Sequence, residues 1–78
     1  MRDYITKDLD LATTLYAFKF PVQFDVQGKL IEFTFSYSDE LKNALERYWD
    51  GTLLIHPQLL FEAKKRLRAR INDSLTNN

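Results

Sequence analysis

The side chains most able to do chemistry form a basic run near the carboxyl end of the chain. Residues 64–70 hold five cations in seven positions: Lys64, Lys65, Arg66, Arg68 and Arg70. Basic helices bind nucleic acid because their cations neutralise backbone phosphates and release counterions. The charge of the chain is also uneven: residues 1–51 contain nine acids and six bases, whereas residues 52–78 contain two acids and five bases. The run is therefore our candidate nucleic-acid interface.

Helical geometry divides this basic run. At about 100° per residue, Lys64 and Arg68 fall on one flank of an apolar seam. Arg66 and Arg70 fall on the other flank, and Lys65 points outward. Long basic side chains beside an apolar seam also cover hydrophobic surface in proteins that bind no nucleic acid. A solvated helix face, and a contact with a protein partner or a second copy of the chain, therefore remain alternatives.

Eleven aromatic residues form the second candidate set. Exposed rings can stack on the bases of single-stranded nucleic acid. Most of the phenylalanines, however, fall on alternating positions, which indicates one buried face of a sheet. Aromatic residues that have a polar tip and lie at the ends of elements suit a surface contact or a subunit interface. The candidates for such an interface are Tyr37, Tyr48 and Trp49.

No set of residues favours an enzyme or a metal site. His56 is the only histidine and the chain has no cysteine, so a zinc site would need several carboxylates. The paired acids each open a predicted helix, where negative charge stabilises the positive end: Asp8, Asp10, Asp39 and Glu40. The two glycines fit a turn and a helix cap and not a phosphate-binding loop. We expect a non-enzymatic protein with no catalytic residue, metal ligand or cofactor.

The chain is predicted to be organised around a β-hairpin over residues 20–26 and 30–37. Apolar and polar residues alternate in both segments, which is the period of half-buried strands. A two-residue turn at Gln27-Gly28 would place both apolar rows on one face. That turn predicts four cross-strand pairs: Val26 with Lys29, Phe24 with Ile31, Val22 with Phe33, and Phe20 with Phe35. Pro21 has no amide donor and predicts a free edge on the first strand.

Three predicted helices, over residues 7–18, 39–50 and 57–74, cover the apolar face of the hairpin. The middle helix has the clearest pattern, since its apolar residues recur at i, i+3, i+4 and i+7: Leu41, Ala44, Leu45 and Tyr48. The predicted N-caps are Thr6 or Asp8 for the first helix and Ser36 or Ser38 for the second. Gly51 is placed to end the second helix in a left-handed cap, and Pro57 suits the first turn of the third.

The remaining segments are short. Residues 3–6 are predicted as an extended lead-in, residues 53–55 as a brief strand or an extended linker, and residues 75–78 as a frayed end. The prediction is one α+β domain over residues 1–78, in the order helix, strand, strand, helix, short extended piece, helix. A domain of this size has little room for a deep substrate cavity.

The predicted location is the cytoplasm. The first residues are polar and charged and lack the apolar segment of a secretory signal. No stretch approaches the roughly 18 apolar residues that a membrane span needs. The absence of cysteine suits a reducing compartment. We therefore expect no membrane contact.

Several motifs resemble a known family. Residues 4–12 open the first predicted helix with Tyr-Ile-Thr-Lys-Asp-Leu-Asp-Leu-Ala, and residues 48–51 close the second with Tyr-Trp-Asp-Gly. Together with Phe33-Thr-Phe35 and Ile55-His-Pro57, they resemble a family of small uncharacterised bacterial proteins, catalogued as a domain of unknown function, whose members look like cargo of phages and other mobile elements. The chain departs from that pattern at residues 18–20, where relatives are expected to have a glycine. The resemblance implies a small binding protein and no particular activity or site residue.

These observations predict a small non-enzymatic interaction module. Its basic carboxyl-terminal helix would contact nucleic acid or a nucleic-acid-handling protein. The alternative prediction is a self-associating structural or protein-binding domain with no nucleic-acid role. Such a homodimer would bury the hairpin edge and the surface around Tyr48 and Trp49.

Overall fold

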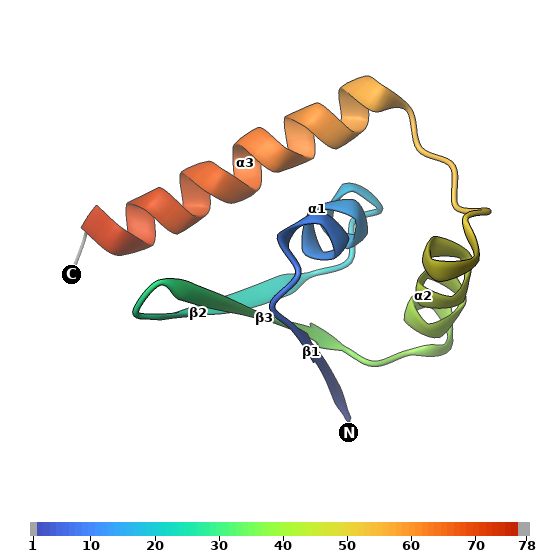
Figure 1. Cartoon of the computed structure of the whole chain (residues 1–78), viewed down its shortest axis with the longest axis horizontal. Helices are drawn as coiled ribbons and strands as arrows, with labels where there is room; N and C mark the ends of the chain where they lie inside the picture. The colour runs from blue at the N-terminus through green and yellow to red at the C-terminus, as the bar shows by residue number, and fades with distance from the viewer. Residues whose placement is uncertain (1, 77–78) are drawn as a thin grey trace.

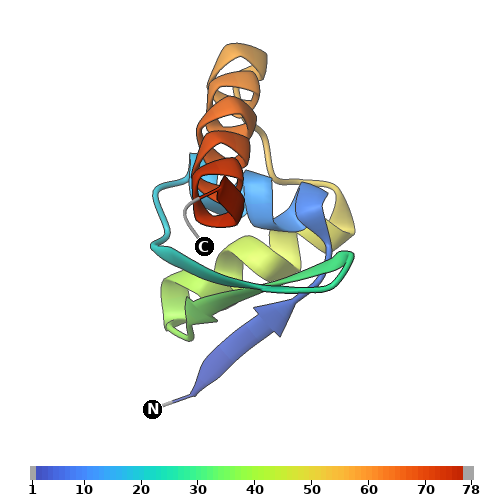
Figure 2. The same ribbon diagram turned by 90° about the vertical axis from the view of Figure 1, so that its left-hand side faces the viewer.

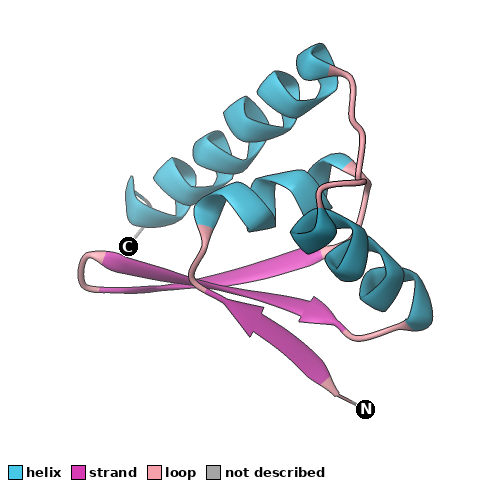
Figure 3. Ribbon diagram, turned by 45° about the vertical axis from the view of Figure 1, so that its right-hand side comes forward, coloured by secondary structure: helices cyan, strands magenta, loops and turns pink. Residues whose placement is uncertain are grey.

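The structure is a computed structural model that describes residues 2–76. The element order is β1 (Asp3–Thr6), α1 (Leu9–Ala17), β2 (Val22–Gln27), β3 (Leu30–Ser36), α2 (Asp39–Asp50) and α3 (Pro57–Thr76). The strands form one antiparallel sheet in the order β1-β3-β2. The sheet lies below α1, α3 lies on the far side of α1, and α2 lies beside α1 at the end of the sheet where β3 stops (Figures 1 and 3).

The α+β class is confirmed, but the chain begins with a strand that the sequence did not predict as one. Residues 3–6, expected to be a lead-in, form β1 and pair with β3 from Asp3↔Ser36 to Thr6↔Phe33. Four residues with only Tyr4 and Ile5 as apolar content carry little strand signal of their own. The strand is fixed by its pairing with β3, which is distant in the sequence.

The hairpin is confirmed, but its predicted register is wrong by two residues. The turn is Gly28-Lys29 and not Gln27-Gly28, so the cross-strand pairs are Val22↔Phe35, Phe24↔Phe33, Val26↔Ile31 and Gln27↔Leu30. Gly28 has φ 65° at the first turn position, where a type II′ turn needs a positive φ. A shift of two preserves the side-chain period, so both apolar rows still share one face. Phe20 lies before β2 and does not oppose Phe35.

The helices match their predicted positions with corrections at three ends. The bounds of α2 are those predicted, with Ser38 as its N-cap and Gly51 as a left-handed C-cap (φ 81°). The first helix is shorter than residues 7–18, because the carboxylate of Asp8 accepts the amides of the first turn and the chain turns away after Ala17. The last helix continues through Thr76, so residues 75 and 76 are helical, and residues 77–78 lie outside the described part. Residues 53–55 form no strand and belong to an irregular linker.

One hydrophobic core joins the three layers. Its largest fully buried side chains come from the sheet and all three helices: Phe33, Phe35, Leu11, Leu15, Leu41 and Leu67. The carboxyl-terminal half of α3 lies above the hairpin, as expected, but its other half lies over α1 (Figure 1). Within residues 2–76, no helix is long and apolar enough to cross a lipid bilayer. The opposite face of the sheet carries no helix (Figure 3).

Candidate nucleic-acid interface

The candidate cations are arranged around the buried seam of α3. Ala63, Leu67 and Ile71 form that seam and are between 0 % and 6 % exposed. Their spacing of four residues turns one stripe of the helix toward α1 and the hairpin. The basic residues are thereby distributed over the two flanks and the outward face, as predicted. They do not form one continuous stripe.

Arg70 lies on the flank that faces β2. Its guanidinium donates to the main-chain carbonyl of Val22 at 3.4 Å. The same group lies over two rings, 5.5 Å from the centre of Phe24 and 5.7 Å from that of Tyr16. Both distances are within the range of a cation–π contact. Arg70 therefore fastens α3 to the sheet and to α1, and we remove it from the candidate phosphate contacts.

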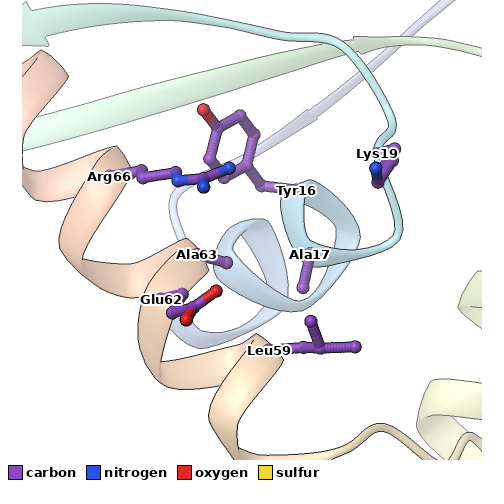
Figure 4. Close-up of a pocket in the computed structure, with 7 residues that line it drawn as sticks. All are labelled: Tyr16, Ala17, Lys19, Leu59, Glu62, Ala63 and Arg66. Atoms are coloured by element: carbon purple, nitrogen blue, oxygen red, sulfur yellow. The ribbon is translucent and has the colours of Figure 1, made fainter.

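Arg66 lies on the same flank, beside a hollow of about 410 Å³ between α1 and the first half of α3. Figure 4 shows Arg66 extending from α3 toward Tyr16 of α1, with Glu62 one helical turn earlier. Lys19, beyond the end of α1, lines the same hollow. The acid offsets part of the positive potential of this flank, which makes it a poorer site for phosphate.

Arg68 lies on the opposite flank, in a different environment. It lines a hollow of about 350 Å³ with Leu9, Ile31, Ile71 and Asn72. A second hollow of about 190 Å³ shares Leu9 and Ile31 and is also lined by Lys7, Lys29, Leu30 and Phe33. We call these two adjoining hollows the cationic groove. Among the described residues, no Asp or Glu lines the groove.

Lys64 and Lys65 complete the basic run. Lys64 is half-buried one helical turn before Arg68, so it belongs to the flank of the cationic groove, whereas Lys65 is exposed on the outward face. Within residues 2–76, the side chains of these two lysines, of Lys29 and of Arg68 form no hydrogen bond or ion pair. Their charges are available to a ligand, in contrast to that of Arg70.

The three candidate interface aromatics differ in exposure. Tyr37 is half-buried, and the guanidinium of Arg2 lies 4.8 Å from the centre of its ring. Tyr48 packs against the core. Burial raises the pKa of the Tyr48 phenol, and the carboxylates of Asp8 and Asp10 at the start of α1 raise that pKa further.

Trp49 is the exception, being 62 % exposed. Its ring centre lies 6.5 Å from that of Tyr4 in β1, with the planes tilted by 60°. Burial raises the pKa of the Tyr4 phenol, and Asp8 adds to the effect. Of the three aromatics, Trp49 has most surface available to a partner.

The histidine has a local role. The Nδ1 atom of His56 accepts the main-chain amide of Gln58 at 3.2 Å, near the start of α3. Across residues 2–76, no three His, Cys, Asp or Glu side chains are grouped in a way that could hold a metal ion.

Comparison with known proteins identifies no relative. No protein-family model, no curated protein and no solved structure matches the chain. The resemblance to a family of phage and mobile-element proteins therefore stays a prediction. A proposal for function depends on the geometry of the chain itself.

Lys29 and Lys7 were not among the predicted site residues, yet both line the smaller hollow of the cationic groove. Lys29 was predicted to pair with Val26 inside the hairpin, whereas it occupies the turn and lines the hollow that adjoins the one lined by Arg68. Lys7 follows β1 at the other end of the same hollow. The sequence could not assign Lys29 to this site, because a lysine next to a turn glycine is common on protein surfaces. Its position beside the groove depends on tertiary packing.

Proposed function

We propose that this protein is a non-enzymatic module that binds nucleic acid through the phosphate backbone. The ligand would lie along the cationic groove and contact Lys29, Lys64 and Arg68. The observation that supports this proposal is the convergence of unpaired cations from the hairpin turn and from α3 on one acid-free groove. Phosphates would replace the water and counterions that otherwise solvate these groups.

The floor of the groove argues for contact with the backbone and not with the bases. Its accessible lining is aliphatic, from Leu9, Leu30 and Ile31. Phe33 is the one aromatic residue among the lining residues described, and it is only 1 % exposed. Base stacking needs an exposed ring. We therefore propose binding with little dependence on base sequence.

The charge distribution would orient the ligand. Asp25 and Glu32 are register partners on the face of the sheet that carries no helix, and Asp3 lies on the same face. These acids repel phosphate on the side of the molecule away from α3. A chain with no net charge can therefore bind a polyanion on one side only.

Binding of labelled oligonucleotides tests the proposal. We expect the affinity of the unchanged chain to fall about twentyfold or more between about 50 and 200 mM salt, because three or four phosphate contacts each release counterions. A triple variant, Lys29→Gln, Lys64→Gln and Arg68→Gln, should bind at least about tenfold more weakly at the lower salt concentration. Fluorescence anisotropy measures both quantities.

The matched control removes three charges elsewhere on the surface. Lys19→Asn, Lys42→Gln and Arg66→Gln lie outside the cationic groove. This control should keep affinity within about twofold of the unchanged chain, because its losses act only through the long-range field. Equal losses in the two triple variants would refute the groove as the site, and no binding at low salt would refute the function.

A further inference from the structure

The edge of the sheet formed by β1 has main-chain groups that point away from β3, and the hydrogen bonds show which groups these are. The Tyr37 amide donates to the Arg2 carbonyl at 3.0 Å, so Arg2 directs its main chain toward β3. Successive residues of an antiparallel strand direct their N–H and C=O groups to alternate sides. Tyr4 therefore also faces β3, whereas Asp3 and Ile5 face away from the sheet. β1 is the outermost strand on this side (Figures 2 and 3).

The side chains along this edge follow the same alternation. Asp3 and Ile5 are exposed on the face of the sheet that carries no helix, and Ile5 is 54 % exposed. Lys7 is two residues further and also exposed, and the chain shows no turn or bend before Asp8, which is still extended (φ −81°, ψ 109°). An acid, an apolar residue and a base thus follow each other at alternate positions along this edge, the base directly beyond the end of β1, where Lys7 also borders the cationic groove.

We propose that a second copy of this chain pairs with β1 as an antiparallel strand centred on Ile5. In this register, Ile5 lies opposite Ile5 of the second copy. Asp3 of each copy lies opposite Lys7 of the other, twice by symmetry. The outward main-chain groups of Asp3 and Ile5 are then all in hydrogen-bonded positions. The pairing joins the two sheets into one of six strands with an isologous interface.

Charge and apolar matching select this register over its neighbours. Centring the pair on Tyr4 would place Asp3 opposite Ile5 of the second copy, so that neither charge nor apolar surface is matched. Centring it on Asp3 would place two carboxylates opposite each other, which is unfavourable. An edge strand that carries charges normally resists pairing with an arbitrary strand. Here the charges along β1 are complementary to those of the same strand in antiparallel orientation, which favours a second copy of the chain as the partner.

The helix face of β1 supports the same partner. Trp49 lies beside Tyr4 with 62 % of its surface exposed. A strand added at this edge would cover part of the indole. On the opposite edge of the sheet, Arg70 of α3 covers part of β2, since it donates to the Val22 carbonyl. The dimer also differs from the predicted one, which would have used the hairpin edge.

The mass of the full chain in solution, measured without nucleic acid from about 1 to 500 µM, tests the proposal. Because the interface is small, we expect the mass to double only in the upper part of that range. Ile5→Pro removes an N–H that makes no bond within the sheet, so it should fold normally and stay monomeric. Asp3→Lys should also be monomeric, since it faces Lys7 of the second copy. Asp3→Lys combined with Lys7→Asp should restore the dimer.

Three outcomes would overturn the dimer: a monomeric mass for the unchanged chain at the highest concentration, self-association of Ile5→Pro at the concentrations of the unchanged chain, or failure of the double charge exchange to restore what Asp3→Lys abolishes. The mass measurement is independent of the nucleic-acid proposal. A monomer that binds oligonucleotides would refute only the dimer, and a dimer that does not bind them would refute only the proposed function.

Discussion

Arg68 and Arg70 are two residues apart on one helix, yet their surroundings differ. The guanidinium of Arg70 reaches the Val22 carbonyl and the Phe24 ring, so β2 and α3 are joined through it. Arg68 borders the cationic groove and has no partner within residues 2–76. A run of basic residues on a helix is therefore not one functional unit. The elements under each flank decide whether a cation stabilises the fold or remains available to a ligand.

Substitution of the residue between the two flanks should have the largest effect. Leu67 is 0 % exposed and positions both Arg68 and Arg70. Leu67→Ala should lower the free energy of unfolding by about 2–5 kcal/mol, because it leaves a cavity between α3 and the rest of the core. Urea denaturation measures the change.

The matched control for this substitution is Leu75→Ala on the same helix, where the side chain is 50 % exposed. It should lower the free energy of unfolding by less than about 1 kcal/mol. Similar losses in the two variants would show that α3 is not held through the Leu67 seam.

The second prediction separates the two arginines by stability. Arg70→Met keeps most of the stem but removes the guanidinium from Val22, Phe24 and Tyr16. We expect it to lower the free energy of unfolding by about 1 kcal/mol, a modest value because Arg70 is exposed and its hydrogen bond is long. Arg68→Met should change the same quantity by less than about 0.5 kcal/mol. Equal effects would remove the distinction between the flanks.

The third prediction concerns Lys19, which lines the hollow beside Arg66. Lys19 has φ 70°, a left-handed conformation that is unfavourable for a residue with a Cβ atom. Lys19→Gly should raise the free energy of unfolding by about 0.5 kcal/mol, since relief of strain is partly offset by the greater entropy of the unfolded chain. Thermal unfolding measures the change, and oligonucleotide affinity should stay unaltered.

The control for this substitution is Lys42→Gly on the solvent-exposed face of α2. There the backbone is helical, so glycine should lower stability by about 1 kcal/mol. A loss of stability in Lys19→Gly as well would contradict the strained turn after α1.

Much of the fold could be predicted because its signals are local. The bounds of α2 follow from the periodic Leu41, Ala44, Leu45 and Tyr48 between a capping Ser38 and Gly51. The hairpin follows from strict alternation, but alternation cannot distinguish turns that differ by two residues. The position of Gly28 as the first turn residue decides the register.

The missing parts depend on contacts between distant segments. Four residues of β1 carry too little pattern to identify a strand, and only their pairing with β3 makes them one. The division of the basic run into two flanks follows from helical periodicity alone. Which flank meets the edge of β2 and which meets an open groove does not, because both depend on how α3 is placed over the sheet. Lys29 could not be assigned to the site for the same reason, because its position beside the groove depends on how the helices are placed over the sheet.

The most direct test of this account compares the salt dependence of oligonucleotide binding in Arg68→Gln and Arg70→Gln. A phosphate contact contributes about 0.7 to the slope of log affinity against log salt for a single strand. We predict that Arg68→Gln lowers the slope by about that amount and that Arg70→Gln leaves it unchanged. Equal reductions in both variants, or no reduction in Arg68→Gln, would contradict the assignment of phosphate contact to the cationic groove.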